Sequence, residues 1–124
     1  MVDEARAVQA RAYAPYSGYR VGAALEAFDG RTFVGCNVEN ASYGLTLCAE
    51  RVAVVRAVAE GVRTFTRIVV VSDSEPPAAP CGACRQVLFE FGPDLVVESV
   101  GPSSRHRWSI EELLPAAFSK GSLA

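Results

Sequence analysis

Two short motifs place cysteines and a glutamate at spacings that suit metal chemistry. They are Cys48-Ala49-Glu50 and Pro80-Cys81-Gly82-Ala83-Cys84. Cys81 and Cys84 are three residues apart, so on the first turn of a helix both sulfurs lie on one face. The positive end of the helix dipole favours thiolates there. The two motifs therefore offer three thiolates to one metal ion.

Three thiolates from two adjacent helix N-termini can occupy three corners of a tetrahedron around Zn²⁺. The fourth corner is then left for water, which is the arrangement of a catalytic zinc site rather than a structural one. A closed site would need a fourth ligand, for which Cys36 is the candidate. Because Cys36 falls on a predicted strand, we interpret it as a small buried hydrophobic residue.

Glu50 follows Cys48 by two residues, close enough to face a zinc-bound water without binding the metal. It can act there as a proton shuttle. A lone C-x-x-C is also typical of a zinc knuckle or a redox pair, and Cys-Ala-Glu alone is typical of an ordinary helix start. Found together, with Pro80 in front of the second motif, they match the signature of zinc deaminases in its three-cysteine form.

The first part of the chain predicts a helix and a hairpin. Residues 3–13 have good helix propensity, and this helix should end before Pro15. Residues 19–28 and 32–36 are expected to form an antiparallel pair. Asp29-Gly30 is a strong signal for a two-residue hairpin turn between them.

The first chemical motif should open a helix over residues 47–60, with Thr46 as its N-cap and Gly61 at its end. The apolar residues of this helix surround most of its circumference, which implies burial on more than one side. A position between a sheet and a second subunit would explain this pattern.

The second motif lies between two strands. Residues 68–71 form an uninterrupted β-branched run, typical of a central strand buried on both faces. The prolines of residues 74–80 predict a loop. Beyond it we expect a helix over 81–91, a strand over 95–100, a short strand around Trp108 and a last helix opened by the capping box Ser109–Glu112. This order predicts an α/β fold, a mixed sheet with helices on both faces.

Composition bounds the possible functions. The 124 residues predict a single domain over 1–124, and a net charge of −2 makes nucleic acid an unexpected partner. No stretch of eighteen apolar residues is present, and the N-terminus carries acidic residues where a targeting signal would be basic. We therefore expect a cytoplasmic protein that does not act at a membrane.

Beyond these motifs, the chain resembles the small homotetrameric cytidine deaminases of the three-cysteine zinc class. The resemblance covers nearly the full length. It is carried by residues 12–17, 21–24, 35–43, 48–51, 80–86 and 112–115. It implies a three-layer αβα sandwich around a mixed, mostly five-stranded sheet.

The resemblance also implies roles for single residues. Cys48, Cys81 and Cys84 would bind zinc, and Glu50 would donate and accept protons. Arg51 would offset the formal charge of −1 that three thiolates and Zn²⁺ carry together. Substrate contacts are expected from Asn37 and Glu39 on the ribose, and from Ala49, Tyr19, Tyr43 and Phe118 around the base, with Phe118 reaching a neighbouring subunit. The family usually has Phe at the position of Tyr19, and the added hydroxyl bears on the preference among pyrimidine nucleosides.

The leading hypothesis is hydrolysis of cytidine and deoxycytidine to uridine and deoxyuridine with release of ammonia, in pyrimidine salvage. The alternatives are a deaminase of a related cytosine-bearing compound, such as an antibiotic nucleoside or the free base, a zinc-stabilised binding protein, and an editing deaminase. The pair Asn37 and Glu39 argues against the free base, which has no ribose. Glu50 would be superfluous in a binding protein, and the chain lacks the basic, aromatic-rich stretch expected of an editing enzyme.

Overall fold

The computed structural model describes residues 1–123 of the chain. Its centre is a five-stranded mixed sheet with the strand order β2-β1-β3-β4-β5. The strands are β1 (Val21–Ala27), β2 (Thr32–Cys36), β3 (Phe65–Ser72), β4 (Val96–Val100) and β5 (Arg105–Ser109). β3 and β4 run parallel, whereas the other neighbouring pairs are antiparallel.

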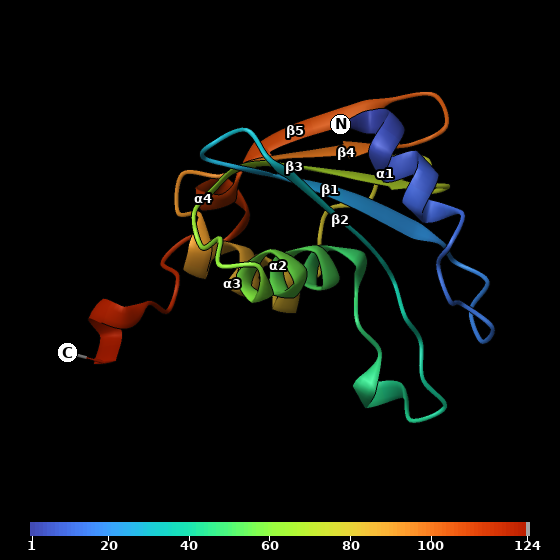
Figure 1. The fold of residues 1–124 in the computed structure, drawn as a ribbon, viewed down its shortest axis with the longest axis horizontal. Coiled ribbons are helices and arrows are strands. Elements are labelled where there is room, and N and C mark those ends of the chain that lie inside the picture. The colour runs from blue at the N-terminus through green and yellow to red at the C-terminus, as the bar shows by residue number, and fades with distance from the viewer. Residues whose placement is uncertain (124) are drawn as a thin grey trace.

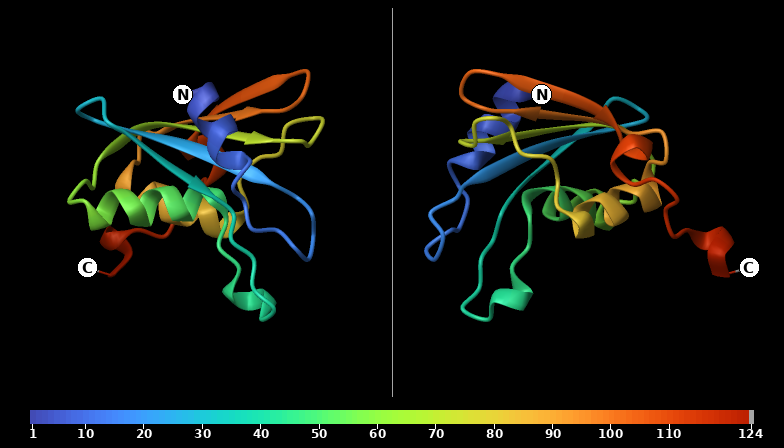
Figure 2. Two further views of the ribbon diagram at one scale, coloured as in Figure 1. Left: turned by 45° about the vertical axis from the view of Figure 1, so that its right-hand side comes forward. Right: turned by 180° about the vertical axis from the view of Figure 1, so that it is seen from behind.

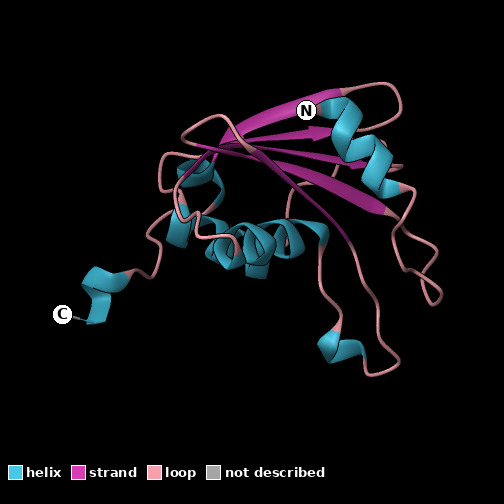
Figure 3. Cartoon of the chain, in the orientation of Figure 1, coloured by secondary structure: helices cyan, strands magenta, loops and turns pink. Residues whose placement is uncertain are grey.

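Helices cover both faces of this sheet (Figures 1 and 2). α1 (Val2–Gln9) lies on one face, and α2 (Ala49–Ala59) and α3 (Gly82–Phe91) lie side by side on the other. The short α4 (Ile110–Leu113) follows β5, and two 3-10 turns, η1 (Tyr43–Leu45) and η2 (Lys120–Leu123), lie outside the main body (Figure 3). The predicted three-layer α/β sandwich is confirmed.

The β-branched run of β3 has the two-sided burial that the sequence predicts. Val69 and Val71 pack toward α1 with Ala5, whereas Ile68 and Val70 belong to the core beneath α2 and α3. All four β-branched side chains are buried, and β3 is the middle strand. The capping box at the start of α4 is also confirmed: the Ser109 hydroxyl accepts from the Glu112 N–H, and the Glu112 carboxylate accepts from the Ser109 N–H.

Several predicted boundaries near the site are wrong. The first helix ends at Gln9 rather than near residue 13, because Tyr13 is held extended beside β2: its N–H donates to the Asn37 carbonyl and its carbonyl accepts from the Glu39 N–H. β1 correspondingly begins at Val21 instead of Tyr19. The residues between α1 and β1 therefore form a loop at the end of the sheet.

The start of α2 also differs from the prediction. Thr46 is not its N-cap, because Leu47 exchanges two backbone hydrogen bonds with Val38 and stays extended. Cys48 takes the N-cap position, with no side-chain capping bond, and α2 begins at Ala49. The Thr46 hydroxyl accepts a hydrogen bond from the Asn40 N–H instead.

The hairpin between β1 and β2 is longer than Asp29-Gly30 predicts. Residues 28–31 separate the two strands: the Ala27 N–H still donates across the hairpin to the Arg31 carbonyl, whereas the Phe28 N–H donates to the Thr64 carbonyl. Gly30 adopts the positive φ (89°) that the sequence suggests for this position. Cys36, at the end of β2, is half-buried rather than buried.

Gly35 sets the distance between β2 and α2. A Cβ at this position would lie 2.5 Å from the Ala53 backbone nitrogen and 2.6 Å from the Ala49 carbonyl oxygen. Neither backbone atom can move without displacing α2. The helix that carries the first chemical motif therefore approaches the sheet closely only because this residue has no side chain.

Gly35→Ala should accordingly lower the free energy of unfolding by about 1–3 kcal/mol, the usual cost of overpacking. Urea denaturation measures this change. Gly121→Ala is the control, because its added Cβ meets only the Ser119 hydroxyl at an ordinary 3.6 Å. Equal denaturation midpoints for the two variants would contradict the close approach of β2 and α2.

Candidate metal centre and adjoining pocket

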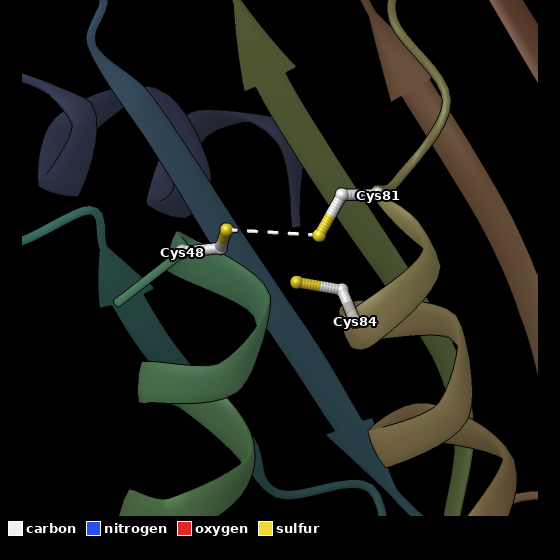
Figure 4. Close-up of side chains that lie close together, drawn as sticks. All are labelled: Cys48, Cys81 and Cys84. Carbon is white, nitrogen blue, oxygen red and sulfur yellow. Dashed lines mark hydrogen bonds between the residues drawn. The ribbon is translucent and has the colours of Figure 1, made fainter. Parts of the chain in front are cut away.

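The three predicted cysteines meet at the N-termini of α2 and α3 (Figure 4). The Sγ atoms of Cys48, Cys81 and Cys84 all lie within 4.8 Å of one another, and those of Cys48 and Cys81 are 3.9 Å apart. Zn–S bonds of about 2.3 Å in a tetrahedron separate the sulfurs by about 3.8 Å. The three thiols therefore fit Zn²⁺. Cys36 does not belong to this cluster within the described residues.

A cysteine occupies the N-cap position of each of the two helices. Cys48 is the N-cap of α2 and Cys81 the N-cap of α3, and neither N-terminus has a side-chain capping bond. The unpaired N–H groups and the positive helix ends favour negative charge at this point. The backbone thus favours deprotonated sulfur, the form that binds a metal.

Arg51 adds a positive charge to the cluster. One of its terminal nitrogens (Nη2) lies 3.7 Å from the Cys48 sulfur and 3.2 Å from the Thr46 carbonyl oxygen. A hydrogen bond from the Cys84 thiol, together with Arg51, lowers the pKa of Cys48 to about 5. The same hydrogen bond and burial raise the pKa of Cys84. The position of Arg51 fits its predicted charge-compensating role.

Glu50 lies beside the thiols with its side chain almost fully buried (5 % exposed). Burial raises the pKa of its carboxyl group to about 7, because removal from water disfavours the charged form. A group with this pKa can both accept and donate a proton near neutral pH.

A pocket of about 280 Å³ opens in front of Glu50. Six predicted site residues line it: Tyr19, Asn37, Glu39, Cys48, Ala49 and Glu50. The lining also includes Thr46, Ser72, Ala78 and Ala79, none of which was predicted as a site residue. These four residues carry no chemical signature, and only the packing of their segments brings them to the pocket.

Asn37 and Glu39 are engaged with the loop between α1 and β1. The Asn37 amide oxygen accepts from the Val21 N–H at 2.9 Å, and its NH₂ donates to the Tyr19 carbonyl at 2.7 Å. An amide has two donors and two lone pairs, so Asn37 keeps one of each for a substrate. The residue thus shapes the pocket in addition to lining it.

The Glu39 carboxylate accepts hydrogen bonds from the backbone N–H groups of Tyr16 and Ser17 at 3.0 and 3.1 Å, and from the Ser17 hydroxyl. The hydrogen bond from the Ser17 side chain and those from the two backbone groups lower the pKa of Glu39. Glu39 therefore presents a negative charge at the pocket near neutral pH.

The loop before Cys81 is anchored to β4 and to the turn that follows it. The Ser99 hydroxyl donates to the Ala78 carbonyl at 2.7 Å, and the Glu75 carboxylate accepts from Ser104 and from the Ser103 N–H. These contacts hold one wall of the pocket and the approach to Cys81. Sequence reasoning missed them because the partners lie more than twenty residues apart.

Two predicted base-contacting residues lie away from their own chain's pocket. Tyr43, on η1, is 75 % exposed, and its ring meets that of Tyr16 edge-on, with ring centroids 5.9 Å apart. Phe118, in the segment that follows α4, is 59 % exposed. Neither side chain lines the pocket of the chain that carries it.

Three clustered thiols and a buried carboxyl group beside a pocket define the active site of a zinc-dependent hydrolytic enzyme. The family model described as "Cytidine and deoxycytidylate deaminase zinc-binding region" matches residues 1–99. The chain therefore belongs to the cytidine and deoxycytidylate deaminase family.

Similar proteins agree with this assignment over nearly the full length. A cytidine deaminase of Sporosarcina psychrophila is 45 % identical over 126 residues, covering 100 % of this chain and 93 % of the relative. A probable cytidine deaminase of Dictyostelium discoideum is 49 % identical, with 98 % and 84 % covered. The crystal structure of cytidine deaminase from Burkholderia pseudomallei is 50 % identical and superimposes with a TM-score of 0.91, covering 94 % of this chain and 95 % of the other.

Within the described residues, no helix is both long and apolar enough to cross a membrane.

Cys84→Ala should lose bound zinc, because the substitution removes one of the three thiol ligands. The loss of the cluster should also free the N-termini of α2 and α3. Metal analysis after dialysis measures the zinc content per chain. Cys36→Ala is the matched control and should keep its zinc, since Cys36 lies outside the cluster. Full zinc occupancy in Cys84→Ala would show that the ligand set is wrong.

Proposed function

We propose that this chain hydrolyses cytidine and deoxycytidine to uridine and deoxyuridine, releasing ammonia, as a step of pyrimidine salvage. The observation that carries the proposal is a buried carboxyl group, Glu50, beside three clustered thiols, at a pocket that Glu50 and Cys48 line. The names of the similar proteins support the nucleoside substrate.

In this proposal Cys48, Cys81 and Cys84 hold the zinc ion. When bound, zinc supplies Lewis acidity that lowers the pKa of water toward neutrality. Arg51 offsets part of the negative charge of the thiolates, since its guanidinium lies 3.7 Å from the Cys48 sulfur.

Glu50 moves the protons. It takes one from the attacking water and delivers it to ring N3, which makes C4 of the base more electrophilic. A second proton then passes through Glu50 to the leaving amine, so that one water is consumed and one ammonia is released. A carboxyl group with a pKa of about 7 suits both directions of transfer.

The remaining pocket residues hold the nucleoside. In this proposal Asn37 and Glu39 bind the ribose hydroxyls, and the hydrogen-bonding capacity that each keeps at the pocket supports this role. Ala49 leaves room beside Glu50, and the Tyr19 ring forms part of the wall. The Tyr19 hydroxyl at this wall bears on the preference among pyrimidine nucleosides and not on the reaction itself.

Ammonia release from cytidine, deoxycytidine, cytosine and cytidine monophosphate tests the proposal. The two nucleosides should react, whereas cytosine should not, since it lacks the ribose that Glu39 binds. Glu50→Gln should keep zinc and fold but lose about 10² to 10⁴ in kcat, because the amide preserves shape and cannot carry the proton. Wild-type turnover in zinc-loaded Glu50→Gln, or equal rates with cytosine, would sink the assignment.

We also propose that the chain assembles into a homotetramer. The outer face of α2 is not covered in the single chain, and Val55 is 56 % exposed. Tyr43, Leu45 and Phe118 are more than half exposed as well, on segments that extend from the body of the chain (Figure 2). Copies of the chain would cover these apolar surfaces and bring Tyr43 and Phe118 to a neighbour's pocket.

Light scattering should then give a mass of about 53 kDa, four times the 13.2 kDa of one chain. The active species should have this mass at assay concentrations, because Phe118 would complete a pocket only across an interface. A fully active 13.2 kDa species would refute the shared pocket.

The compartment that we propose is the cytoplasm. Cys48 and Cys81 have sulfurs only 3.9 Å apart, and reducing conditions keep such thiols available for metal.

A further inference from the structure

Arg85 and Gln86, two consecutive residues of α3, donate hydrogen bonds to backbone carbonyls before Cys81 and at and beyond the end of α4. Arg85 donates from Nε to the Pro80 carbonyl and from Nη1 to the Leu113 carbonyl, both at 2.8 Å. Pro80 directly precedes Cys81, and Leu113 is the last residue of α4. One guanidinium therefore ties the approach to the metal site to the start of the C-terminal segment, residues 114–123.

Gln86 holds the same C-terminal segment further along. Its side-chain nitrogen Nε2 donates to the Phe118 carbonyl at 2.8 Å. Between the two anchors the chain turns through Ala116, whose φ of 53° lies in the left-handed region that non-glycine residues rarely adopt. The direction in which Phe118 leaves the body of the chain is thus defined by two side-chain bonds from α3.

Packing holds this segment only in part. Pro115, Ala116 and Phe118 are exposed, Leu114, Ala117 and Ser119 are half-buried, and a hollow lies between Phe89 and Pro93 on one side and Ala116 on the other. Lys120 makes only a surface ion pair with Glu90 at 3.5 Å, a type of contact that contributes little to stability. Within the described residues, the bonds from Arg85 and Gln86 are the side-chain hydrogen bonds that join α3 to this segment and to the end of α4.

We propose that Arg85 and Gln86 are positioning residues that link the metal site of one subunit to the aromatic wall of the next subunit's pocket. Arg85 fixes the backbone ahead of Cys81, and Gln86 sets the position from which Phe118 reaches the neighbour. The inference rests on the proposed function, in which Phe118 completes an adjacent pocket. A single helix, α3, then builds its own metal site and orders the substrate contact of another subunit.

The chain offers a direct probe of the anchoring that is independent of activity. Lys120 is its single lysine, so a lysine-specific protease cuts at this residue alone. Gln86→Ala and Arg85→Lys should each speed this cleavage of the folded protein about 3- to 10-fold, the equivalent of one lost hydrogen bond. Glu111→Ala, an exposed position on α4, is the control and should change the rate less than about 2-fold. Unchanged cleavage in both anchor variants would overturn the proposal.

Kinetics separate the two anchors. Gln86→Ala should raise KM for cytidine about 3- to 10-fold with kcat and zinc content unchanged. Arg85→Lys should in addition lose zinc faster to a chelator, because a single ammonium nitrogen lacks the rigid fork with which Nε and Nη1 reach two separate carbonyls. If Phe118→Ala raises KM while Gln86→Ala does not, the positioning role is refuted. If Phe118→Ala itself leaves KM unchanged, the proposed shared pocket fails, and the cleavage assay still decides the anchoring.

Mixed tetramers show whose pocket Gln86 serves. In hybrids of Gln86→Ala and Phe118→Ala chains, every pocket should receive either a misplaced ring or none, so KM should stay raised. Recovery of the wild-type KM in a fraction of the pockets would mean that Gln86 acts on the pocket of its own chain, which would overturn the inference.

Discussion

The convergence of two helix N-termini over one end of the sheet is the constraint on which the rest of this structure depends. Cys48 and Cys81 are the N-caps of α2 and α3, and neither helix has a side-chain cap, so unpaired N–H groups and helix dipoles face the sulfurs. Deprotonated thiols, the form that binds a metal, satisfy this field. The fold brings three thiols to within 4.8 Å of one another at the N-termini of two helices that have no side-chain cap.

The sheet makes this convergence possible because α2 packs closely against β2. Gly35 lets the backbone of α2 lie directly on β2, and the parallel pair β3 and β4 places α3 beside α2 on the same face. Burial in this layer also raises the pKa of Glu50 toward neutrality. The packing that stabilises the fold thus sets the protonation behaviour of the group proposed to catalyse the reaction.

Polar side chains around the pocket act on the backbone as much as on a substrate. Asn37 and Glu39 hold the loop between α1 and β1, and Ser99 holds the loop before Cys81. Each satisfies backbone groups of a segment that has no regular secondary structure of its own. The pocket is therefore formed before a ligand arrives, which lowers the entropic cost of binding.

The sequence by itself determined the features that depend on local spacing. The cysteine and glutamate motifs, the two-sided burial of β3 and the capping box at Ser109 were all predicted, because each follows from residues a few positions apart. Only the tertiary structure decided where α1 ends and α2 begins, since Tyr13 and Leu47 pair with the chain around Val38 and this pairing overrides helix propensity. The contacts of Arg85 and Gln86 with the C-terminal segment were likewise beyond prediction, because they join residues 28 and 32 positions apart whose types carry no signal of partnership.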